Sequence, residues 1–209
     1  MHGEKKKMLA YVYEGEGKLC LKEVPEPAPG NDNAVIKVNA CSICGTDFRT
    51  HLYGSKKIIP SRIVGHEVVG TIVEAGREIS GFQKGDRVAV APAVGCGSCH
   101  SCTRGHPNMC DNLQTLGFQY DGGFAQYMLI PAAAFKMNNV NKLNNTIEDE
   151  EAALAEPIAC VINSHEFLNI TKGDSVAVFG SGFIGCMHAE LAFRSGAEKV
   201  IMVEMAKNR

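Results

Sequence analysis

The stretch Ser175-Val176-Ala177-Val178-Phe179-Gly180-Ser181-Gly182-Phe183-Ile184-Gly185 decides the fold of the C-terminal part of this chain. A short apolar run predicts a buried strand, the spacing Gly-x-Gly-x-x-Gly follows it, and a helix is predicted through Arg194. Alone, this glycine spacing is weak evidence, but a strand before it and a helix after it make it specific. The stretch therefore predicts a dinucleotide-binding unit built on a parallel sheet.

The glycines of this turn have separate predicted tasks. Gly180 allows the tight turn, Gly182 lets a pyrophosphate approach the N-terminus of the helix, and Gly185 permits close packing of helix on strand. A second strand is predicted at Lys199–Val203, and Glu204 at its end can accept hydrogen bonds from the ribose of an adenosine. The candidate cofactor-binding residues are Gly180, Gly182, Phe183, Ile184, Gly185, Glu204 and Arg209.

The acid at position 204 also predicts which dinucleotide binds. A carboxylate there repels a 2′-phosphate, so NAD is favoured over NADP. Lys207 and Arg209 lie just beyond it and weaken this preference, because either cation could reach a phosphate.

Upstream of this unit, Ile147 to Leu168 is the first long helical pattern, with an expected interruption at Pro157. The change from strands to helix predicts a domain boundary near residue 155, with domains at 1–155 and 156–209. Glu156 lies at this boundary. A carboxylate at the start of a helix is stabilised by the helix dipole, and on the sequence alone this role and metal ligation are equally favoured. Cys160 and Cys186 are predicted core residues.

The N-terminal domain is predicted to be a small β-barrel. Short apolar segments at 8–13, 19–24, 34–40, 68–73 and 87–91 have strand composition, and turn residues rather than helices separate them. A glycine turn and a strand are predicted at 122–130. The asparagine-rich segment from Asn138 to Asn145 is predicted to be a surface loop.

Three separated signals in the chain have metal-binding chemistry. His66 and Glu67 follow Gly65 where a buried strand begins, Cys44 lies upstream, and Glu156 lies downstream. A histidine beside a strand is more often a hydrogen-bonded core or surface residue. A thiolate, an imidazole and a carboxylate together could nevertheless form a zinc site that keeps one position open. Thr46 could place a hydroxyl beside a metal-bound oxygen, and Asp47 is expected to cap the following helical turn.

The most specific signal is a set of four cysteines in a lobe at about 95–111: Cys96, Cys99, Cys102 and Cys110. Thiolates separated by two residues can hold one ion tetrahedrally, and four of them close its coordination sphere to water. Free buried cysteines and an iron–sulfur cluster are the alternatives, and structural zinc is favoured. A thioredoxin-like redox pair at Cys41 and Cys44 would need a βαβ setting that this part of the sequence lacks.

Composition limits the possible partners. The chain has 209 residues, a net charge of −2 and a pI near 6.4, so it has no field to attract nucleic acid or an acidic membrane. No apolar run approaches the length of a membrane span, and the N-terminal apolar segment is too short for a signal peptide. A cytoplasmic protein is expected.

These motifs resemble the zinc-containing medium-chain dehydrogenases of the alcohol dehydrogenase superfamily, and most closely their sorbitol and polyol dehydrogenase branch. The resemblance runs nearly end to end. It rests on the following segments: Cys44-Gly45-Thr46-Asp47, Gly65-His66-Glu67, Gly70, Gly76, Gly85-Asp86-Arg87-Val88, the four-cysteine lobe, Glu156-Pro157 and Gly180 to Gly185. It implies a mixed α/β chain in which a GroES-like β-barrel catalytic domain precedes a Rossmann domain.

The resemblance also implies an activity and its residues. Cys44 and His66 would bind a catalytic zinc, with either Glu67 or Glu156 as the third ligand, so two zinc ions per chain are expected. Zinc would polarise a secondary alcohol or a polyol, a hydride would pass to NAD, and Thr46 would take the proton outward. Relatives often carry a histidine in this relay at the position of Arg49, whereas here His51 lies two residues further on.

A complete Rossmann domain winds about six strands, and this chain stops after a strand, a helix and a strand, so a truncated piece that could be inactive by itself is expected. The complete protein is expected to form a homo-dimer or homo-tetramer. The alternatives are a non-catalytic zinc- and nucleotide-binding relative, a dehydrogenase for threonine or simple alcohols, and a zinc-free quinone reductase, which the cysteines and His66 argue against.

Overall fold

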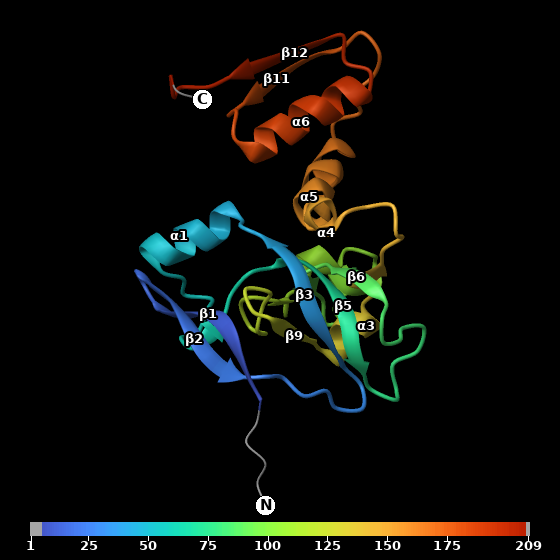
Figure 1. Cartoon of the computed structure of the whole chain (residues 1–209). Coiled ribbons are helices and arrows are strands. Elements are labelled where there is room, and N and C mark those ends of the chain that lie inside the picture. The colour runs from blue at the N-terminus through green and yellow to red at the C-terminus, as the bar shows by residue number, and fades with distance from the viewer. Residues whose placement is uncertain (1–5, 208–209) are drawn as a thin grey trace, which may run out of the picture. The chain divides into compact units, whose positions relative to one another are not determined.

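The structure is a computed structural model that describes residues 6–207. Internal contacts divide the chain into two compact units, Met1–Leu154 and Ala155–Arg209, and each is described by itself. Figure 1 shows a first unit made mainly of strands and a second unit in which helices accompany a small sheet.

A three-stranded sheet with the order β2-β1-β4 begins the first unit. It consists of β1 (Lys7–Gly15), β2 (Lys18–Pro25) and β4 (Arg62–Ile63), all antiparallel. The side chains of β1 alternate, since Met8, Ala10 and Val12 are buried whereas Leu9 and Tyr11 are exposed. The two strands predicted at 8–13 and 19–24 are confirmed, and both are longer than predicted.

A five-stranded antiparallel sheet with the order β10-β6-β5-β3-β9 forms the main body of this unit. Its strands are β10 (Val140–Lys142), β6 (Arg87–Val90), β5 (Glu67–Ala75), β3 (Ala34–Ser42) and β9 (Tyr127–Ile130). β3 and β5 run side by side in Figure 1. β1 contacts the segment that leads into β9, where the Tyr11 N–H donates to the Phe124 carbonyl at 2.8 Å. The main core lies on this sheet, with Ile36, Ile72, Val88, Leu116, Met128 and Ile130 fully buried.

Two element predictions are wrong in detail. The segment 138–145 is not all loop, because Val140 pairs with Val90 and is only 7 % exposed. A strand of three residues is too short to show a period in the sequence. The helical pattern from 147 divides into α4 (Asp149–Ala152) and α5 (Ala155–His165), so the break precedes Pro157. Pro157 lies in the first turn of α5, where a missing N–H removes no helical hydrogen bond.

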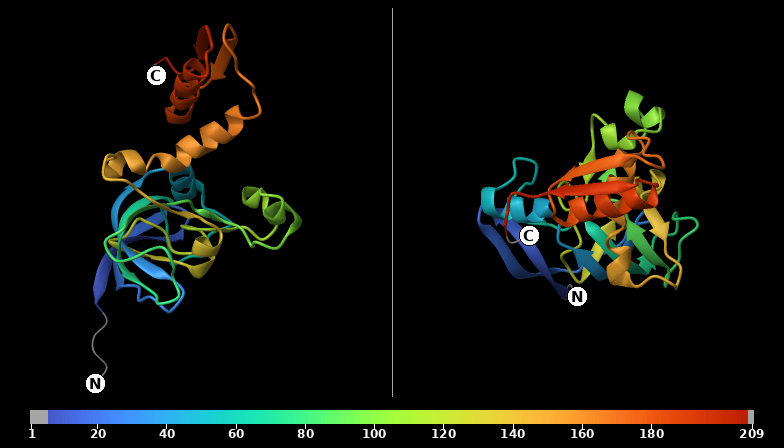
Figure 2. Two further views of the ribbon diagram at one scale, coloured as in Figure 1. Left: turned by 90° about the vertical axis from the view of Figure 1, so that its right-hand side faces the viewer. Right: turned by 90° about the horizontal axis from the view of Figure 1, so that it is seen from above.

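The second unit contains β11 (Ser175–Phe179), α6 (Phe183–Arg194) and β12 (Lys199–Val203). The two strands are parallel, with Phe179 opposite Val203, and α6 lies along their sheet (Figure 2). These three predicted elements are confirmed. The core prediction for Cys160 and Cys186 is wrong, because both residues are exposed. No helix within residues 6–207 is long and apolar enough to cross a membrane.

Candidate metal centre

The four cysteines of the lobe lie together in the structure. They are carried by the segment between β7 (Ala93–Val94) and β8 (Gln114–Thr115), which includes α2 (His100–Thr103) and the 3-10 helix η1 (Pro107–Met109). The sulfurs of Cys96, Cys99, Cys102 and Cys110 all lie within 4.8 Å of one another. The four cysteines of the lobe are free thiols, and the 3.8 Å between the sulfurs of Cys99 and Cys110 is far longer than a disulfide bond.

Backbone amides around the lobe favour thiolates. The Cys96 N–H donates to the Cys110 sulfur at 3.2 Å, and the Cys99 N–H donates to the Cys96 sulfur at 3.3 Å. Hydrogen bonds from the Ser98 backbone, then from its hydroxyl and other neighbours, lower the pKa of Cys96 to about 6. Desolvation instead raises the pKa of Cys102 to about 11. Four converging sulfurs with donors aimed at them fit a closed zinc site.

Gly95 makes the close packing of this lobe possible. A Cβ atom at this position would lie 2.9 Å from the Cys102 sulfur and 3.0 Å from Cβ of Pro107. Any larger residue would therefore push a sulfur away from the other three.

A second cluster contains Cys44, His66 and Glu67, whose ligand atoms also lie within 4.8 Å of one another. Cys44 is the N-cap of α1 (Gly45–Tyr53), His66 precedes β5, and Glu67 is the first residue of β5. His66 is 7 % exposed and Glu67 is 3 % exposed. Pairing of β3 with β5 brings these segments together, because β3 leads directly to Cys44. Three predicted metal ligands of the first domain thus meet in one place, where His66 and Glu67 are buried and Cys44 is half-buried.

Gly65 holds the backbone that presents His66. It has φ +93°, and a Cβ atom there would lie 2.6 Å from the ring of Phe124. Both observations require glycine. The ring of Phe118 packs edge-on against the His66 imidazole, with centroids 5.8 Å apart, and shields it from water.

Asp47 takes part in this cluster, although the sequence indicated only a helix cap. One of its oxygens accepts the Cys44 N–H at 3.0 Å, as expected for a cap, and the other lies 3.4 Å from Nδ1 of His66. Nδ1 has no hydrogen-bond partner among the described residues, and its contact with Asp47 is long. One ring nitrogen of His66 lies among the clustered ligand atoms, so the ring can offer a nitrogen to a metal.

The charges around His66 suit a cation. Burial lowers the pKa of His66, but Asp47 and Cys44 raise it more, and the net result is a pKa of about 10. A site that attracts a proton this strongly also attracts a divalent cation, which takes the place of that proton. A half-buried thiol with a buried imidazole and a buried carboxylate fits zinc.

The other predicted catalytic residues are placed as follows. Thr46 is exposed, and its N–H donates to the Cys44 sulfur at 3.4 Å. Glu156 belongs to the second unit, in the first turn of α5, where its Oε1 lies 3.6 Å from the Cys160 sulfur. In the proton-relay region of α1, Arg49 is exposed, while Nδ1 of His51 is buried without a hydrogen-bond partner in the described chain.

The glycine turn of the second unit has the predicted form. Gly180 has φ +102°, and a Cβ atom on Gly185 would lie 1.9 Å from the Gly180 carbonyl oxygen. Gly182 is the N-cap of α6, and Phe183 and Ile184 form its exposed first turn. The backbone N–H groups of that turn have no partner within the helix, so they are available to a phosphate.

Glu204 follows β12 and closes this turn. Its carboxylate accepts the backbone N–H of Ser181 at 3.0 Å, the Ser181 hydroxyl at 3.2 Å and the N–H of Ala206 at 2.9 Å. The Ser181 backbone is the main reason that the pKa of Glu204 is lowered to about 2. Glu204 is therefore an anion beside the predicted cofactor site. Arg209, the last predicted cofactor residue, lies outside the described residues.

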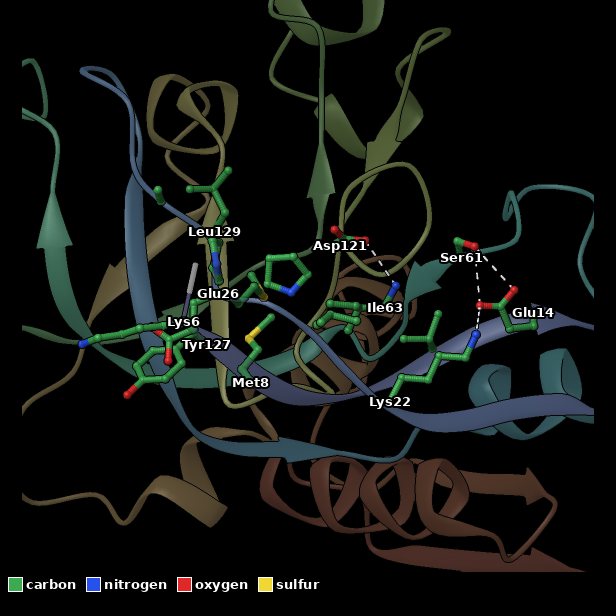
Figure 3. A pocket seen from close by; sticks show the side chains of 16 residues that line it. Lys6, Met8, Glu14, Lys22, Glu26, Ser61, Ile63, Asp121, Tyr127 and Leu129 are labelled. Atoms are coloured by element: carbon green, nitrogen blue, oxygen red, sulfur yellow. Dashed lines mark hydrogen bonds and ion pairs between the residues drawn. The ribbon is translucent and has the colours of Figure 1, made fainter. Parts of the chain in front are cut away.

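A groove of about 900 Å³ lies elsewhere on the first unit, between β1, β2 and β9. Figure 3 shows its charged wall, where Lys22 donates to Glu14 at 2.6 Å and Ser61 approaches the same carboxylate. None of the residues that line it belongs to either metal-ligand cluster.

Comparison with known proteins gives consistent results. Residues 30–139 match the model of the alcohol dehydrogenase GroES-like domain. A sorbitol dehydrogenase of Halalkalibacterium halodurans is 36 % identical over 196 residues, which are 93 % of this chain and 55 % of the relative. An L-threonine 3-dehydrogenase of Cronobacter sakazakii is 35 % identical over 208 residues, which are 97 % of this chain and 58 % of the relative.

A solved structure is also similar. It is a candidate zinc-binding dehydrogenase of Sinorhizobium meliloti bound to NADP, with a TM-score of 0.89 and 35 % identity. The match covers 98 % of this chain and 58 % of that one. The chain therefore spans little more than half the length of the proteins that it matches.

Proposed function

The chain belongs to the alcohol dehydrogenase superfamily of medium-chain dehydrogenases, as the match of its GroES-like domain shows, and we therefore propose that the complete protein is a zinc-dependent oxidoreductase of alcohols. It transfers a hydride from a secondary alcohol or polyol to NAD. The observation that carries this proposal is the meeting of Cys44, His66 and Glu67 in one cluster, in which the histidine and the glutamate are buried. This activity is proposed for the complete protein and not for the 209-residue chain alone.

The residues of the first unit prepare the metal centre. Cys44 contributes a thiolate, His66 contributes Nε2, and Glu67 or Glu156 completes the set. Asp47 holds the His66 ring from the Nδ1 side, as partners of ligating histidines commonly do. When bound, zinc supplies Lewis acidity toward the alcohol oxygen. Thr46 is the proposed first acceptor of the alcohol proton. Position 49 is arginine and not histidine, so the proton route beyond Thr46 would have to use another residue.

The second unit is proposed to bind the dinucleotide. The exposed N–H groups at the start of α6 would receive the pyrophosphate, and Glu204 would hydrogen-bond to the adenosine ribose. We propose NAD because the Glu204 carboxylate, whose pKa is about 2, stays charged and repels a 2′-phosphate. The similar protein of Sinorhizobium meliloti is bound to NADP, so both cofactors belong in the test.

The substrate is proposed to be sorbitol or a similar polyol, with threonine as the second candidate. Each is supported by a similar relative, a sorbitol dehydrogenase and an L-threonine 3-dehydrogenase. We also propose a cytoplasmic location, since the free thiols of the cysteine lobe suit a reducing compartment. A homo-dimer or homo-tetramer is proposed for the complete protein.

The test is an assay of the full-length protein with polyols, simple secondary alcohols and threonine, each with NAD and with NADP. We expect NADH formation with at least one alcohol and its loss in His66→Ala. Zinc content measured in parallel should be two per chain for wild type and one for Cys44→Ala. Equal zinc contents in these two proteins, or no turnover with any alcohol, would contradict the proposal.

A further inference from the structure

Ser42 contacts the metal-ligand cluster from the neighbouring strand. It lies directly opposite Glu67 in the antiparallel pairing of β3 with β5. Its hydroxyl donates to Oε2 of Glu67 and also lies 3.4 Å from the carbonyl oxygen of Ala153. A hydroxyl has one proton to donate, and an ionised carboxylate is a stronger acceptor than a carbonyl. The proton of Ser42 is therefore committed to Glu67.

This hydrogen bond makes the two oxygens of Glu67 unequal. Oε2 is occupied by Ser42, and Oε1 is free of that bond. Glu67 is 3 % exposed, so water does not compensate for a missing donor there. Because Ser42 and Glu67 sit on paired strands, the backbone fixes their separation, and little side-chain freedom is lost when the bond forms.

We propose that Ser42 is a positioning residue of the metal centre, which holds Glu67 so that a single carboxylate oxygen faces the metal. The inference rests on the proposed function, in which Cys44 and His66 bind zinc, and it takes Glu67 as the third ligand. A carboxylate that binds through both oxygens would fill one more coordination position. By keeping Glu67 to one oxygen, Ser42 leaves that position for the oxygen of the substrate.

A purely structural role for Ser42 makes a different prediction. If the hydroxyl only stabilises the pairing of β3 with β5, its loss would lower the stability of the chain and leave the geometry of a bound metal unchanged. Coordination geometry is therefore the measurement that separates the two roles, and cobalt(II) reports it because its visible bands weaken as the coordination number rises.

The experiment uses the 209-residue chain with the cysteine lobe filled by zinc, followed by titration of the second site with cobalt(II) against a competing chelator. The variants are Ser42→Ala, Ser42→Thr, Ser42→Val and Glu67→Gln. Thr and Val have nearly the same shape and differ in the hydroxyl, so they form a matched pair. Ser61→Ala is the control, because the Ser61 hydroxyl lies 3.4 Å from the Glu14 carboxylate, and neither residue belongs to a metal-ligand cluster.

We expect Ser42→Ala and Ser42→Val to weaken cobalt binding by about 10- to 100-fold, the usual loss when a partner of a metal ligand is removed. Their visible bands should also weaken. Ser42→Thr should keep the wild-type affinity and spectrum, and so should Ser61→Ala. If Ser42→Ala does not fold by circular dichroism, the comparison of Thr with Val decides the question.

Two results would overturn the inference while the proposed function stands. One is a wild-type spectrum and affinity for Ser42→Val beside weakened binding in Glu67→Gln. The other is a folded Ser42→Thr that behaves like Ser42→Val, because the hydroxyl would then not be the cause. A different result would contradict the proposed function itself, namely unchanged cobalt binding in both Glu67→Gln and Cys44→Ala.

Discussion

The carboxylate of Asp47 serves two neighbours at once: Oδ2 accepts the backbone N–H of Cys44 at 3.0 Å, and Oδ1 lies 3.4 Å from Nδ1 of His66. Asp47 is 8 % exposed, so this arrangement is shielded from water. The start of helix α1 and the orientation of the imidazole before β5 therefore depend on one buried side chain.

Replacing this carboxylate by an amide should weaken the metal centre more than the fold. Asp47→Asn keeps an oxygen for the Cys44 N–H but removes the negative charge that faces His66. We expect zinc affinity at the Cys44 cluster to fall by about 10- to 100-fold, as measured by chelator competition. Asp32→Asn, an exposed acid away from both clusters, serves as the control. An unchanged affinity in Asp47→Asn would show that Asp47 is only a helix cap.

The cysteine lobe should depend on its metal for stability. Cys110 is the most buried of its four thiols, so Cys110→Ser should abolish zinc binding there and reduce zinc content by one per chain. Losing a closed zinc site should lower the free energy of unfolding by at least about 2 kcal/mol, which corresponds to a fall of about 4 °C or more in Tm at this chain length. Cys20→Ser is the matched control, since Cys20 is exposed and outside both clusters. A full zinc complement in Cys110→Ser would contradict the assignment of this ligand.

Glu204 should decide between the two dinucleotides in the full-length protein. Glu204→Gln removes the charge opposite a 2′-phosphate, so NADPH binding should strengthen relative to NADH by about tenfold or more. Titrations that follow the fluorescence of each reduced cofactor give the two Kd values. Glu190→Gln on the same unit, where Glu190 pairs with Arg194 at 2.7 Å, should leave the ratio unchanged. The hypothesis fails if Glu204→Gln leaves it unchanged as well.

The histidine pair between α5 and α6 should make stability sensitive to pH. Nε2 of His165 and Nδ1 of His188 lie 3.0 Å apart, so one neutral ring donates to the other. Burial, then the proximity of His188, lowers the pKa of His165 in the folded chain. An unfolded histidine titrates near about 6.5. Below that pH the unfolded chain binds more protons than the folded chain, so stability falls as the pH drops toward the folded pKa of His165.

Urea unfolding at pH 7.5 and at pH 5 measures this effect. The loss of stability between the two conditions should be smaller in His165→Gln than in wild type. His106→Gln, which changes an exposed histidine of the cysteine lobe, should keep the wild-type pH dependence. A loss in His165→Gln as large as in wild type would place the responsible group elsewhere.

Local patterns in the sequence were sufficient for several elements. The strands at 175–179 and 199–203 and the helix between them match the prediction. Short or interrupted elements were predicted less well. β10 has only three residues, and the break before α5 falls at residues that carry no helix-breaking side chain. At β10 a contact with a distant residue decides the conformation, since Val140 pairs with Val90.

The amino-acid sequence by itself determined the glycine turn and the spacing of the four-cysteine lobe, because each depends on residues close together in the chain. Only the tertiary structure decided that Asp47 faces His66 and that Ser42 binds Glu67. These contacts join different elements, and the register of β3 against β5 fixes which side chains lie opposite each other. A shift of that register by one residue would turn Glu67 to the other face of the sheet, and no local pattern in either strand specifies the register.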